Sequence, residues 1–255
     1  MTDFERAIAF SRAFDRRRVE RIVRTEHGEA LLTPSLPLVY HRNHFSVDLG
    51  VDISAEELIA EADSVLGPEG YRFRKITVDD DLGKRLAAPF RELGWRVDEL
   101  LVQLYRGPLP AVDTSAVDEV AGADLQPVWI SGLRASPEIS TEEEIRQLVA
   151  AQHGRRQGAT VRYFAARMDG QIASYCELFL ADGVGQIESV MTLEQFRNRG
   201  FATSVVTRAF EESLRADSEV TFICADAHDW PQELYAKLGF RAAGRMWDFL
   251  LTEST

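Results

Sequence analysis

Hydrophobic and polar residues alternate along the chain with two different periods, and the two halves show these patterns in the same order. Residues 71–80 ("YRFRKITVDD") and 219–228 ("EVTFICADAH") alternate as strands do, and each is followed by a helical pattern. A glycine then ends the helix, Gly94 in one half and Gly239 in the other, before an apolar strand returns. The segments "LGWR" and "LGFR" around these glycines align at an offset of 145 residues. The sequence therefore predicts an internal duplication.

The two halves are joined by a segment with little apolar pattern. Residues 106–116 read "RGPLPAVDTSA" and contain two prolines, which is typical of a linker. We place the boundary near residue 110, which predicts one domain over residues 1–110 and a second over residues 111–255.

The pattern of the second half predicts an α/β domain with a mixed sheet and helices on its faces. Residues 160–180 alternate as a hairpin whose turn is Asp169-Gly170. A strand follows at residues 185–192 and a helix at residues 202–216. An earlier helix opens at residue 140 with a capping box of Ser140 and Glu143.

Composition and charge exclude several classes of protein. The 255 residues suffice for one large or two ordinary domains, and no stretch approaches the roughly 20 apolar residues of a membrane span. The first 20 residues contain no signal-peptide core, so the expected location is the cytoplasm. A net charge of -12 argues against a nucleic-acid-binding surface. Any polyanionic ligand must therefore be held by a local positive pocket.

The few cysteines and histidines do not form a recognisable metal or disulfide pattern. Cys176 and Cys224 each lie inside a strand-like run, where a small buried side chain is expected rather than a nucleophile. His41 and His44 have a suggestive spacing, but no carboxylate or cysteine cluster accompanies them. No metal site is predicted.

The strongest candidate for chemistry is the loop "RNRGFATS" at residues 197–204, between the strand and helix described above. A strand, a glycine turn and a helix together present free backbone N–H groups and a positive helix end to an anion. Gly200 permits close approach to a ligand, Ala202 does not block it, and Arg197 and Arg199 add full charges. The alternative is an ordinary loop with solvated arginines.

Two motifs give this loop a family resemblance. The spacing Arg-x-x-Gly-x-Ala from Arg197 to Ala202 resembles motif A of the GCN5-related N-acetyltransferase superfamily, and "LYAKLGF" at residues 234–240 resembles that family's closing motif. The likeness covers residues 116–251. The Gly-Lys-Ser/Thr ending of a nucleotide-binding P-loop is absent from this segment.

The resemblance implies two tandem domains of this fold, with mostly antiparallel mixed sheets and, in the second domain, central strands that splay apart. Acetyl-CoA is the implied acetyl donor. Its diphosphate and pantetheine arm are expected on the loop and on the preceding strand, where the N–H nearest Val190 or Met191 would stabilise the oxyanion. The implied cofactor-binding residues are Val190, Met191, Thr192, Arg197, Asn198, Arg199, Gly200, Phe201, Ala202 and Thr203.

The resemblance also implies an N-acetyltransferase in which an amine attacks the thioester directly. Tyr235 occupies the position of the family's general acid, although a tyrosine packed in the core is the alternative. The general base stays open between Glu188 on the central strand, His228 after the following strand, and Glu177. A small-molecule or peptide amine would be the acceptor, and the negative net charge mildly favours a cationic one.

The first half departs from the motif. Phe90 replaces the tyrosine, and residues 41–61 ("HRNHFSVDLGVDISAEELIAE") lack the Arg-x-x-Gly-x-Ala spacing. We therefore expect a degenerate N-terminal domain that has lost acetyl-CoA binding and acts as scaffold, cleft wall or regulatory site. Thr192 and Glu194 also depart from the residues usual in the family, so a non-catalytic acyl-CoA-binding module is the rival prediction. The sequence leaves a monomer and a homodimer equally open.

Overall fold

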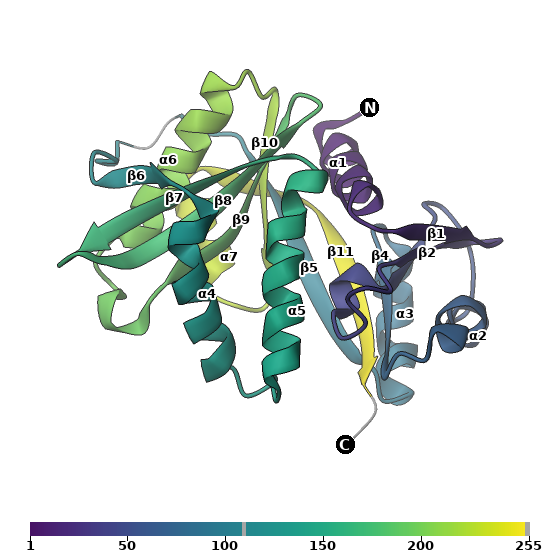
Figure 1. The fold of residues 1–255 in the computed structure, drawn as a ribbon. Helices are drawn as coiled ribbons and strands as arrows, with labels where there is room; N and C mark the ends of the chain where they lie inside the picture. Colours follow the sequence, from purple (N-terminus) through teal and green to yellow (C-terminus); the bar gives the residue numbers. More distant parts are fainter. Residues whose placement is uncertain (109–110, 253–255) are drawn as a thin grey trace.

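The structure is a computed structural model that describes residues 1–108 and 111–252 (Figure 1). Its first half starts with a helix and continues with short strands before a strand-helix-strand unit. The elements are α1 (Asp3–Arg17), β1 (Arg21–Arg24), β2 (Gly28–Leu32), η1 (Tyr40–Arg42), β3 (His44–Val47), α2 (Ala55–Leu66), η2 (Gly67–Glu69), β4 (Phe73–Val78), α3 (Leu82–Glu92) and β5 (Arg96–Tyr105).

The second half has mostly longer strands, and near its start it has two α-helices where the first half has one. Its elements are β6 (Val117–Val120), α4 (Gly122–Ala135), α5 (Glu142–His153), η3 (Gly154–Gln157), β7 (Thr160–Met168), β8 (Gln171–Ala181), β9 (Val184–Thr192), η4 (Glu194–Phe196), α6 (Phe201–Arg215), β10 (Val220–Asp226), α7 (Pro231–Lys237) and β11 (Phe240–Thr252).

The local sequence signals of the second half are mostly confirmed. Asp169 and Gly170 have φ angles of 52° and 76°, as a two-residue hairpin turn of this type requires. The capping box of α5 lies one residue later than expected, because Thr141 is the N-cap and Glu144 closes the box. Ser140 precedes that N-cap and its backbone N–H also donates to Glu144. The sequence "STEEE" at residues 140–144 fits the capping-box pattern from either of two start positions, Ser140 or Thr141.

The described strands form one sheet in the order β1-β2-β3-β4-β11-β5-β10-β9-β8-β7-β6. The pairs β3–β4 and β9–β10 are parallel, and the other neighbouring pairs are antiparallel. The predicted α/β class with a mixed, mostly antiparallel sheet is confirmed. The two halves do not each have their own sheet, however, because their strands join in a single one.

The halves are joined by an exchange of their last strands. β11 of the second half lies between β4 and β5 of the first, and β5 lies between β11 and β10. At the offset of 145 residues, Leu100 corresponds to Arg245 and Leu101 to Met246. The observed register pairs Leu100 with Met246 and Leu101 with Arg245. Each pair is thus related to the other by a two-fold rotation, which supports the predicted duplication.

Aromatic side chains anchor each exchanged strand in the core of the other half. Trp247 and Phe249 of β11 are buried among the residues of α2, α3 and β4. In the opposite direction, Tyr105 of β5 stacks on Phe210 of α6, with ring centroids 3.7 Å apart. Truncating one buried aromatic of this size costs about 3–5 kcal/mol, so each half depends on the other for stability.

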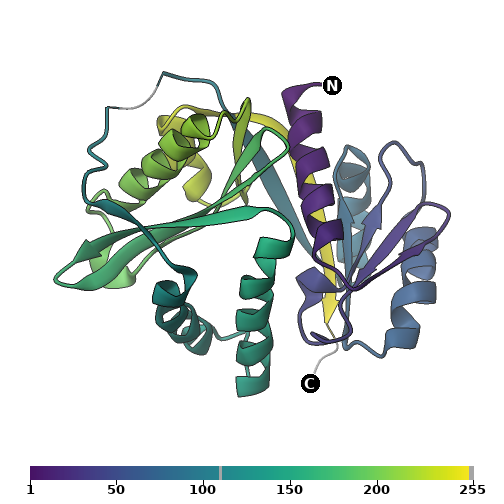
Figure 2. The same cartoon turned by 45° about the horizontal axis from the view of Figure 1, so that its top comes forward.

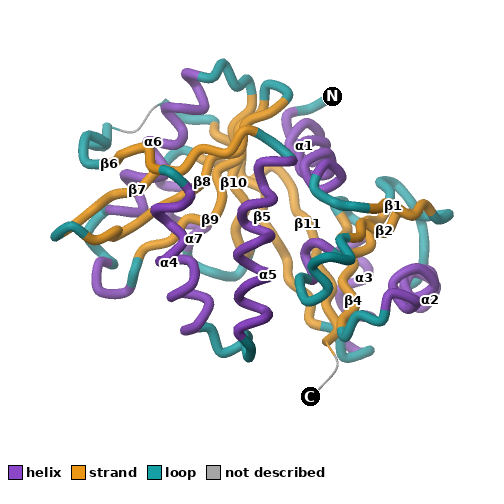
Figure 3. Tube along the Cα trace, in the orientation of Figure 1, coloured by secondary structure: helices purple, strands orange, loops and turns teal. Residues whose placement is uncertain are grey.

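Helices cover both faces of the sheet (Figure 3). Tyr175 and Cys176 are neighbours on β8 and point to opposite faces, and Tyr175 packs with α4 whereas Cys176 packs with α6. α1 lies on the α4 face, across the middle of the molecule (Figure 2), where Phe10 and Phe14 pack against strands of both halves. Among the described helices, none combines the length and apolarity that crossing a bilayer would demand.

The predicted boundary at residue 110 lies outside the described residues, so the division into residues 1–110 and 111–255 stays a prediction. β5 ends before it at Tyr105, and β6 begins after it at Val117. A division there would separate each half from the strand that the other half contributes to its core.

We predict that neither half is stable without the other. A fragment of residues 1–108 lacks β11, and a fragment of residues 111–255 lacks β5, so each exposes an unpaired strand edge and an incomplete core. Expressed alone, both fragments should aggregate or show no cooperative unfolding by circular dichroism. Co-expressed, they should elute as a one-to-one complex. A monomeric second fragment that unfolds at the temperature of the whole chain would contradict this prediction.

Candidate functional site

A cavity of about 470 Å³ opens between the end of β9, the start of α6 and the start of α7. It contains nine of the ten residues that the sequence resemblance assigned to cofactor binding, and Arg199 is the exception. The lining residues are Val190, Met191, Thr192, Phe196, Arg197, Asn198, Gly200, Phe201, Ala202, Thr203, Trp230, Pro231, Leu234 and Tyr235. The loop and the closing motif, more than 30 residues apart in sequence, therefore meet at one site.

The N-terminus of α6 borders this cavity and has no side-chain cap among the described residues. Gly200 is the N-cap with a φ of 82°, no side chain caps the helix, and its first turn has no acidic residue. By contrast, α1, α2 and α5 each begin with a capping box. The first N–H groups of α6 thus lack side-chain acceptors, and together with the positive helix end they favour an anion.

The two arginines of the loop, Arg197 and Arg199, lie in different places relative to the cavity. Arg197 and Asn198 line the cavity, and Asn198 has a left-handed φ of 61°. Within the described part of the chain, no carboxylate lies within 4.0 Å of the Arg197 guanidinium. Arg199 instead places its Nη1 3.3 Å from the sulfur of Met168. Of the two predicted arginines, Arg197 is the one positioned for a ligand in the cavity.

Two large apolar side chains at the cavity are exposed. Met191 is 44% exposed and Trp230 is 61% exposed. Apolar side chains of this size usually gain by being covered, and exposed groups of them often mark ligand sites. The cavity thus combines a helix end that has free N–H groups with an apolar wall.

The central strands separate at this site, as predicted. β9 and β10 pair only from Val184 to Ile187, although β9 continues to Thr192. Ser189 has a φ of 53°, and the register between β8 and β9 shifts at the same place. This bulge, followed by the divergence of the strands, opens the space beside Val190 and Met191.

Tyr235 lies on α7 at the inner wall of the cavity and is largely buried. Burial raises the pKa of its phenol, and the nearby charge of Glu188 acts in the same direction. The phenol therefore stays protonated at neutral pH. A neutral phenol that borders a cavity can donate a proton or a hydrogen bond to a ligand there.

Glu188 is half-buried on β9, near Tyr235 but outside the residues that line the cavity. Burial raises the pKa of its carboxyl, whereas the charge of Arg155 acts to lower it. The Nε2 of Gln186 donates to Glu188 at 2.8 Å. A carboxyl with a raised pKa is better suited to accept a proton near neutral pH than an ordinary glutamate.

An arginine that the sequence reasoning missed organises this region. Arg155 of η3 donates from Nη1 to Glu177 Oε1 at 2.5 Å and to Ser189 Oγ at 3.0 Å. Glu177 is completely buried, which makes it a structural partner of Arg155 rather than an accessible base. The signal was present in the sequence, because a glutamate inside the apolar run "ASYCELFL" requires a cationic partner.

His228 is not among the residues that line the cavity. Its side chain is exposed, and its Nε2 lies 3.1 Å from Glu99 Oε2. Arg245 donates from Nε to the other oxygen of Glu99 at 2.9 Å. Glu99 belongs to β5, so this contact joins the first half to the loop between β10 and α7.

The two cysteines are free and sit on opposite sides of the sheet. Burial raises the pKa of the Cys176 thiol and of the Cys224 thiol well above its ordinary value. Both therefore remain protonated at neutral pH, which is the state of a packing residue and not of a nucleophile.

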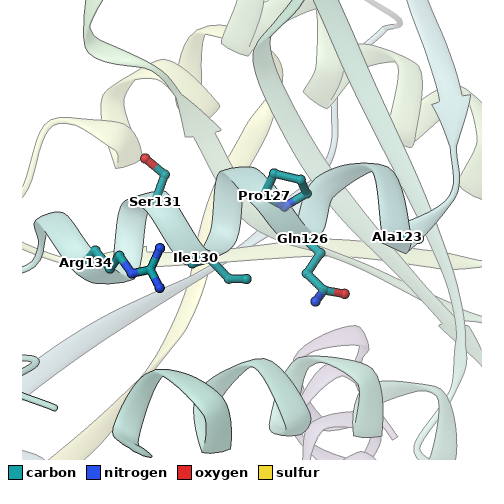
Figure 4. Close-up of a pocket in the computed structure, with 6 residues that line it drawn as sticks. All are labelled: Ala123, Gln126, Pro127, Ile130, Ser131 and Arg134. Carbon is teal, nitrogen blue, oxygen red and sulfur yellow. The ribbon is translucent and has the colours of Figure 1, made fainter. Parts of the chain in front are cut away.

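A second hollow, of about 490 Å³, runs along α4 (Figure 4). α4 and α5 are antiparallel, since Gln126 lies 3.3 Å from His153 at one end and Arg134 donates to Glu142 at the other. The side chains of Gln126, Ile130 and Arg134 point to the same side of α4 in Figure 4. Its described lining residues include no carboxylate, histidine or tyrosine that could transfer a proton.

The first half has no comparable anion site at the equivalent helix. α2 is capped by Ser54, with which Glu57 forms a capping box, and Glu56 adds a second negative charge to its first turn. Phe90, the counterpart of Tyr235, is fully buried and packs against Phe249 with ring centroids 4.2 Å apart. The helix end that would meet a diphosphate is already satisfied by its own chain.

Comparisons with known proteins identify the same fold. Residues 167–248 match the model of the "FR47-like protein" family. A structure of a functionally unknown conserved protein from Staphylococcus epidermidis is 15% identical with a TM-score of 0.71, and covers 93% of this chain and 95% of its own. A GCN5-related N-acetyltransferase from Kribbella flavida is 16% identical with a TM-score of 0.67, covering 99% of this chain and 96% of its own.

A tandem protein of the same superfamily, from the clavulanic acid biosynthesis pathway, is 18% identical with a TM-score of 0.59. It covers 92% of this chain and 82% of its own. No curated protein sequence matches this chain. The predicted resemblance to GCN5-related N-acetyltransferases and the tandem architecture are thus confirmed at the level of the fold.

We predict that Arg155 stabilises the fold through its buried ion pair. The substitution Arg155→Met leaves the Glu177 charge buried and unpaired, which should lower the free energy of unfolding by about 3–5 kcal/mol. The double variant Arg155→Met, Glu177→Met should recover much of this loss, because it removes both charges. Denaturant unfolding followed by circular dichroism measures these differences.

The surface pair of Arg134 and Glu142 is the matched control. Both side chains are exposed, so Arg134→Met should cost less than about 1 kcal/mol. An Arg155→Met variant as stable as Arg134→Met would show that the buried pair does not carry the stability we assign to it.

Proposed function

We propose, from the fold that this chain shares with GCN5-related N-acetyltransferases, that it transfers an acetyl group from acetyl-CoA to an amine. The observation that carries the proposal is the uncapped N-terminus of α6, which borders a cavity whose inner wall is Tyr235. The cavity volume of about 470 Å³ lies in the range of roughly 300–1,000 Å³ that small-molecule sites occupy. Acetyl-CoA supplies the activated acetyl group.

The proposed arrangement assigns one part of acetyl-CoA to each wall of the cavity. The N–H groups of Phe201, Ala202 and Thr203, with the guanidinium of Arg197, would bind the diphosphate. The main chain from Val190 to Thr192 would pair with the pantetheine arm as an added strand, since β10 diverges there.

The reaction needs three contributions from the protein. The amine nitrogen bonds to the carbonyl carbon of the thioester, and the N–H of Val190 or Met191 stabilises the oxyanion that develops. The carbon–sulfur bond then breaks, and the phenol of Tyr235 gives its proton to the departing thiolate. The proton lost by the amine goes to Glu188 through water, because burial raises the pKa of this carboxyl.

His228 is the second candidate for the base, because its loop leads directly into Trp230 and Pro231 of the cavity wall. Its contact with Glu99 joins it to β5 of the first half. We propose that residues 1–110 act as scaffold and rim and do not bind acetyl-CoA, since the start of α2 carries its own cap and negative charges. Residues 111–255 would form the catalytic part.

We predict that acetyl-CoA binds and raises the thermal unfolding midpoint, and that Arg197 contributes to this binding. A hydrogen bond to a charged group contributes about 1.5–3 kcal/mol, so Arg197→Ala should weaken acetyl-CoA binding about tenfold or more. Isothermal titration calorimetry measures the change. Arg199→Ala is the control, because Arg199 lies against Met168, and its affinity should change less than about threefold. Absence of acetyl-CoA binding by the unaltered chain would end the proposal.

We predict that Tyr235→Phe lowers kcat by about 10²-fold while acetyl-CoA affinity stays unchanged, since the variant lacks only the proton donor. Release of free CoA in the presence of a panel of amines measures turnover. Tyr105→Phe removes a phenol buried away from the cavity and should keep the original rate. Equal rates for Tyr235→Phe and the unaltered chain would exclude the acid role. Binding without CoA release for any amine would instead favour the non-catalytic module.

A further inference from the structure

A group of basic side chains gathers where the first half meets α5 and η3 of the second half. The two halves touch there directly: the N–H of Leu38 donates to Gln147 Oε1 at 2.9 Å. A Cβ atom placed on Gly154 would lie only 3.1 Å from Arg42 Nη1. The basic group, which we name the seam cluster, consists of Arg18, His41, Arg42, Lys75 and Arg155.

Most members of the seam cluster have an acidic partner. Lys75 donates to Asp248 at 2.7 Å, and Arg155 donates to Glu177. Arg18 pairs with Asp15, although its Nε has no acceptor among the described residues. Among the described residues these contacts leave His41 and Arg42 without an ion-pair partner, and one member of this pair is a permanently charged group.

Arg42 is that member. It is only 3% exposed, and neither its Nε nor its Nη1 has a hydrogen-bond acceptor within residues 1–108 and 111–252. No carboxylate of these residues forms an ion pair with it. Burial, together with the charge of Arg18, lowers the pKa of Arg42 to about 10, so the group still carries its proton at neutral pH.

The fold alone gives an incomplete account of this buried charge. Arg42 packs at the C-terminus of α5, where the helix dipole favours a cation. The stabilisation from this partial charge is smaller than the free-energy cost of desolvating an unpaired guanidinium. Buried guanidinium groups with free donors are instead typical of sites that bind a carboxylate or a phosphate.

Charges of both signs lie near Arg42: Arg18 acts to lower the pKa of its guanidinium, whereas Asp15 and Glu20 act to raise it. Beside it, at His41, the positive charges dominate. The pKa of His41 is lowered well below its ordinary value, first by burial and then by positive charges around it. Those charges belong to Lys75, Arg18, Arg155 and Arg42. An anion at this point would interact favourably with several cations at once, although the chain as a whole has a net charge of -12.

We propose that the seam cluster is an anion-binding subsite for the acceptor, which is therefore an amine that carries a carboxylate or a phosphate. This inference rests on the proposed acetyl transfer. Arg155 connects the two sites, because it belongs to the cluster and also bonds to Ser189, the residue next to Glu188. The acceptor's amine would lie toward Glu188 and its anionic group toward Arg42. Such a subsite would favour an anionic acceptor, whereas the net charge alone mildly favours a cationic one.

Pairs of amines that differ only in the anionic group test the proposal. We expect the ratio kcat/KM to be at least tenfold higher for glycine than for glycinamide, or for O-phosphoethanolamine than for ethanolamine. The first pair reports on a carboxylate and the second on a phosphate. In Arg42→Met the favoured amine should lose this advantage through a higher KM, whereas its neutral counterpart should change less than twofold. Arg42→Lys should recover part of the preference, and Arg85→Met, at an arginine in an exposed ion pair with Asp52, should retain all of it.

A binding measurement separates this proposal from the acetyl-transfer proposal. In an Arg197→Ala background, which weakens the proposed diphosphate site at α6, inorganic phosphate or acetate should raise the thermal unfolding midpoint by a few degrees. Adding Arg42→Met to this background should remove most of that rise. Circular dichroism verifies that the variant is folded, which we expect because the substitution removes an unpaired charge. Failure of both anions to bind, or equal use of charged and neutral amines, overturns the anion subsite. Failure of acetyl-CoA to bind overturns the transfer reaction instead.

Discussion

The exchange of the last strands between the two halves is the constraint on which the rest of this structure depends. β5 and β11 lie side by side at the centre of the sheet, and each completes the sheet of the opposite half. Because Trp247 and Phe249 fill the core of the first half while Tyr105 fills that of the second, neither core is complete alone. The helices pack on this shared sheet. α1 lies across the strands where the two halves meet, since Phe10 and Phe14 pack with residues of β5, β8 and β10.

The candidate site uses departures from regular strand structure within that rigid sheet. β9 and β10 pair at their beginnings and separate after Ile187, with a bulge at Ser189 on the same strand. Arg155 holds the bulge from one side and ties it to the buried Glu177. The free end of α6 then meets the opened space. The surrounding sheet is rigid, so the unpaired main chain of β9 and the start of α6 stay accessible to a ligand. In a regular sheet the main chain of β9 would be paired with β10.

Much of this could be predicted from the sequence, because it depends on local chemistry. The glycine at position 200, the hairpin at Asp169 and the common order of elements in the halves are short-range signals. The strand exchange could not be predicted, since the pattern of β11 fits any sheet with a free edge. Arg155 was missed for a similar reason: its partner Glu177 lies 22 residues away and is brought near it only by the fold. The position of His228 likewise depends on Glu99 of the other half.

The two-fold relation between β5 and β11 has a consequence for the origin of the protein. A single repeat that exchanged its last strand with an identical copy would form a homodimer with two equivalent helix ends, one at each counterpart of Gly200. In one covalent chain the two halves are free to differ. One copy could then acquire Ser54 and its glutamates at the helix start while the other kept a bare glycine. The covalent link between the halves therefore allows each half to specialise.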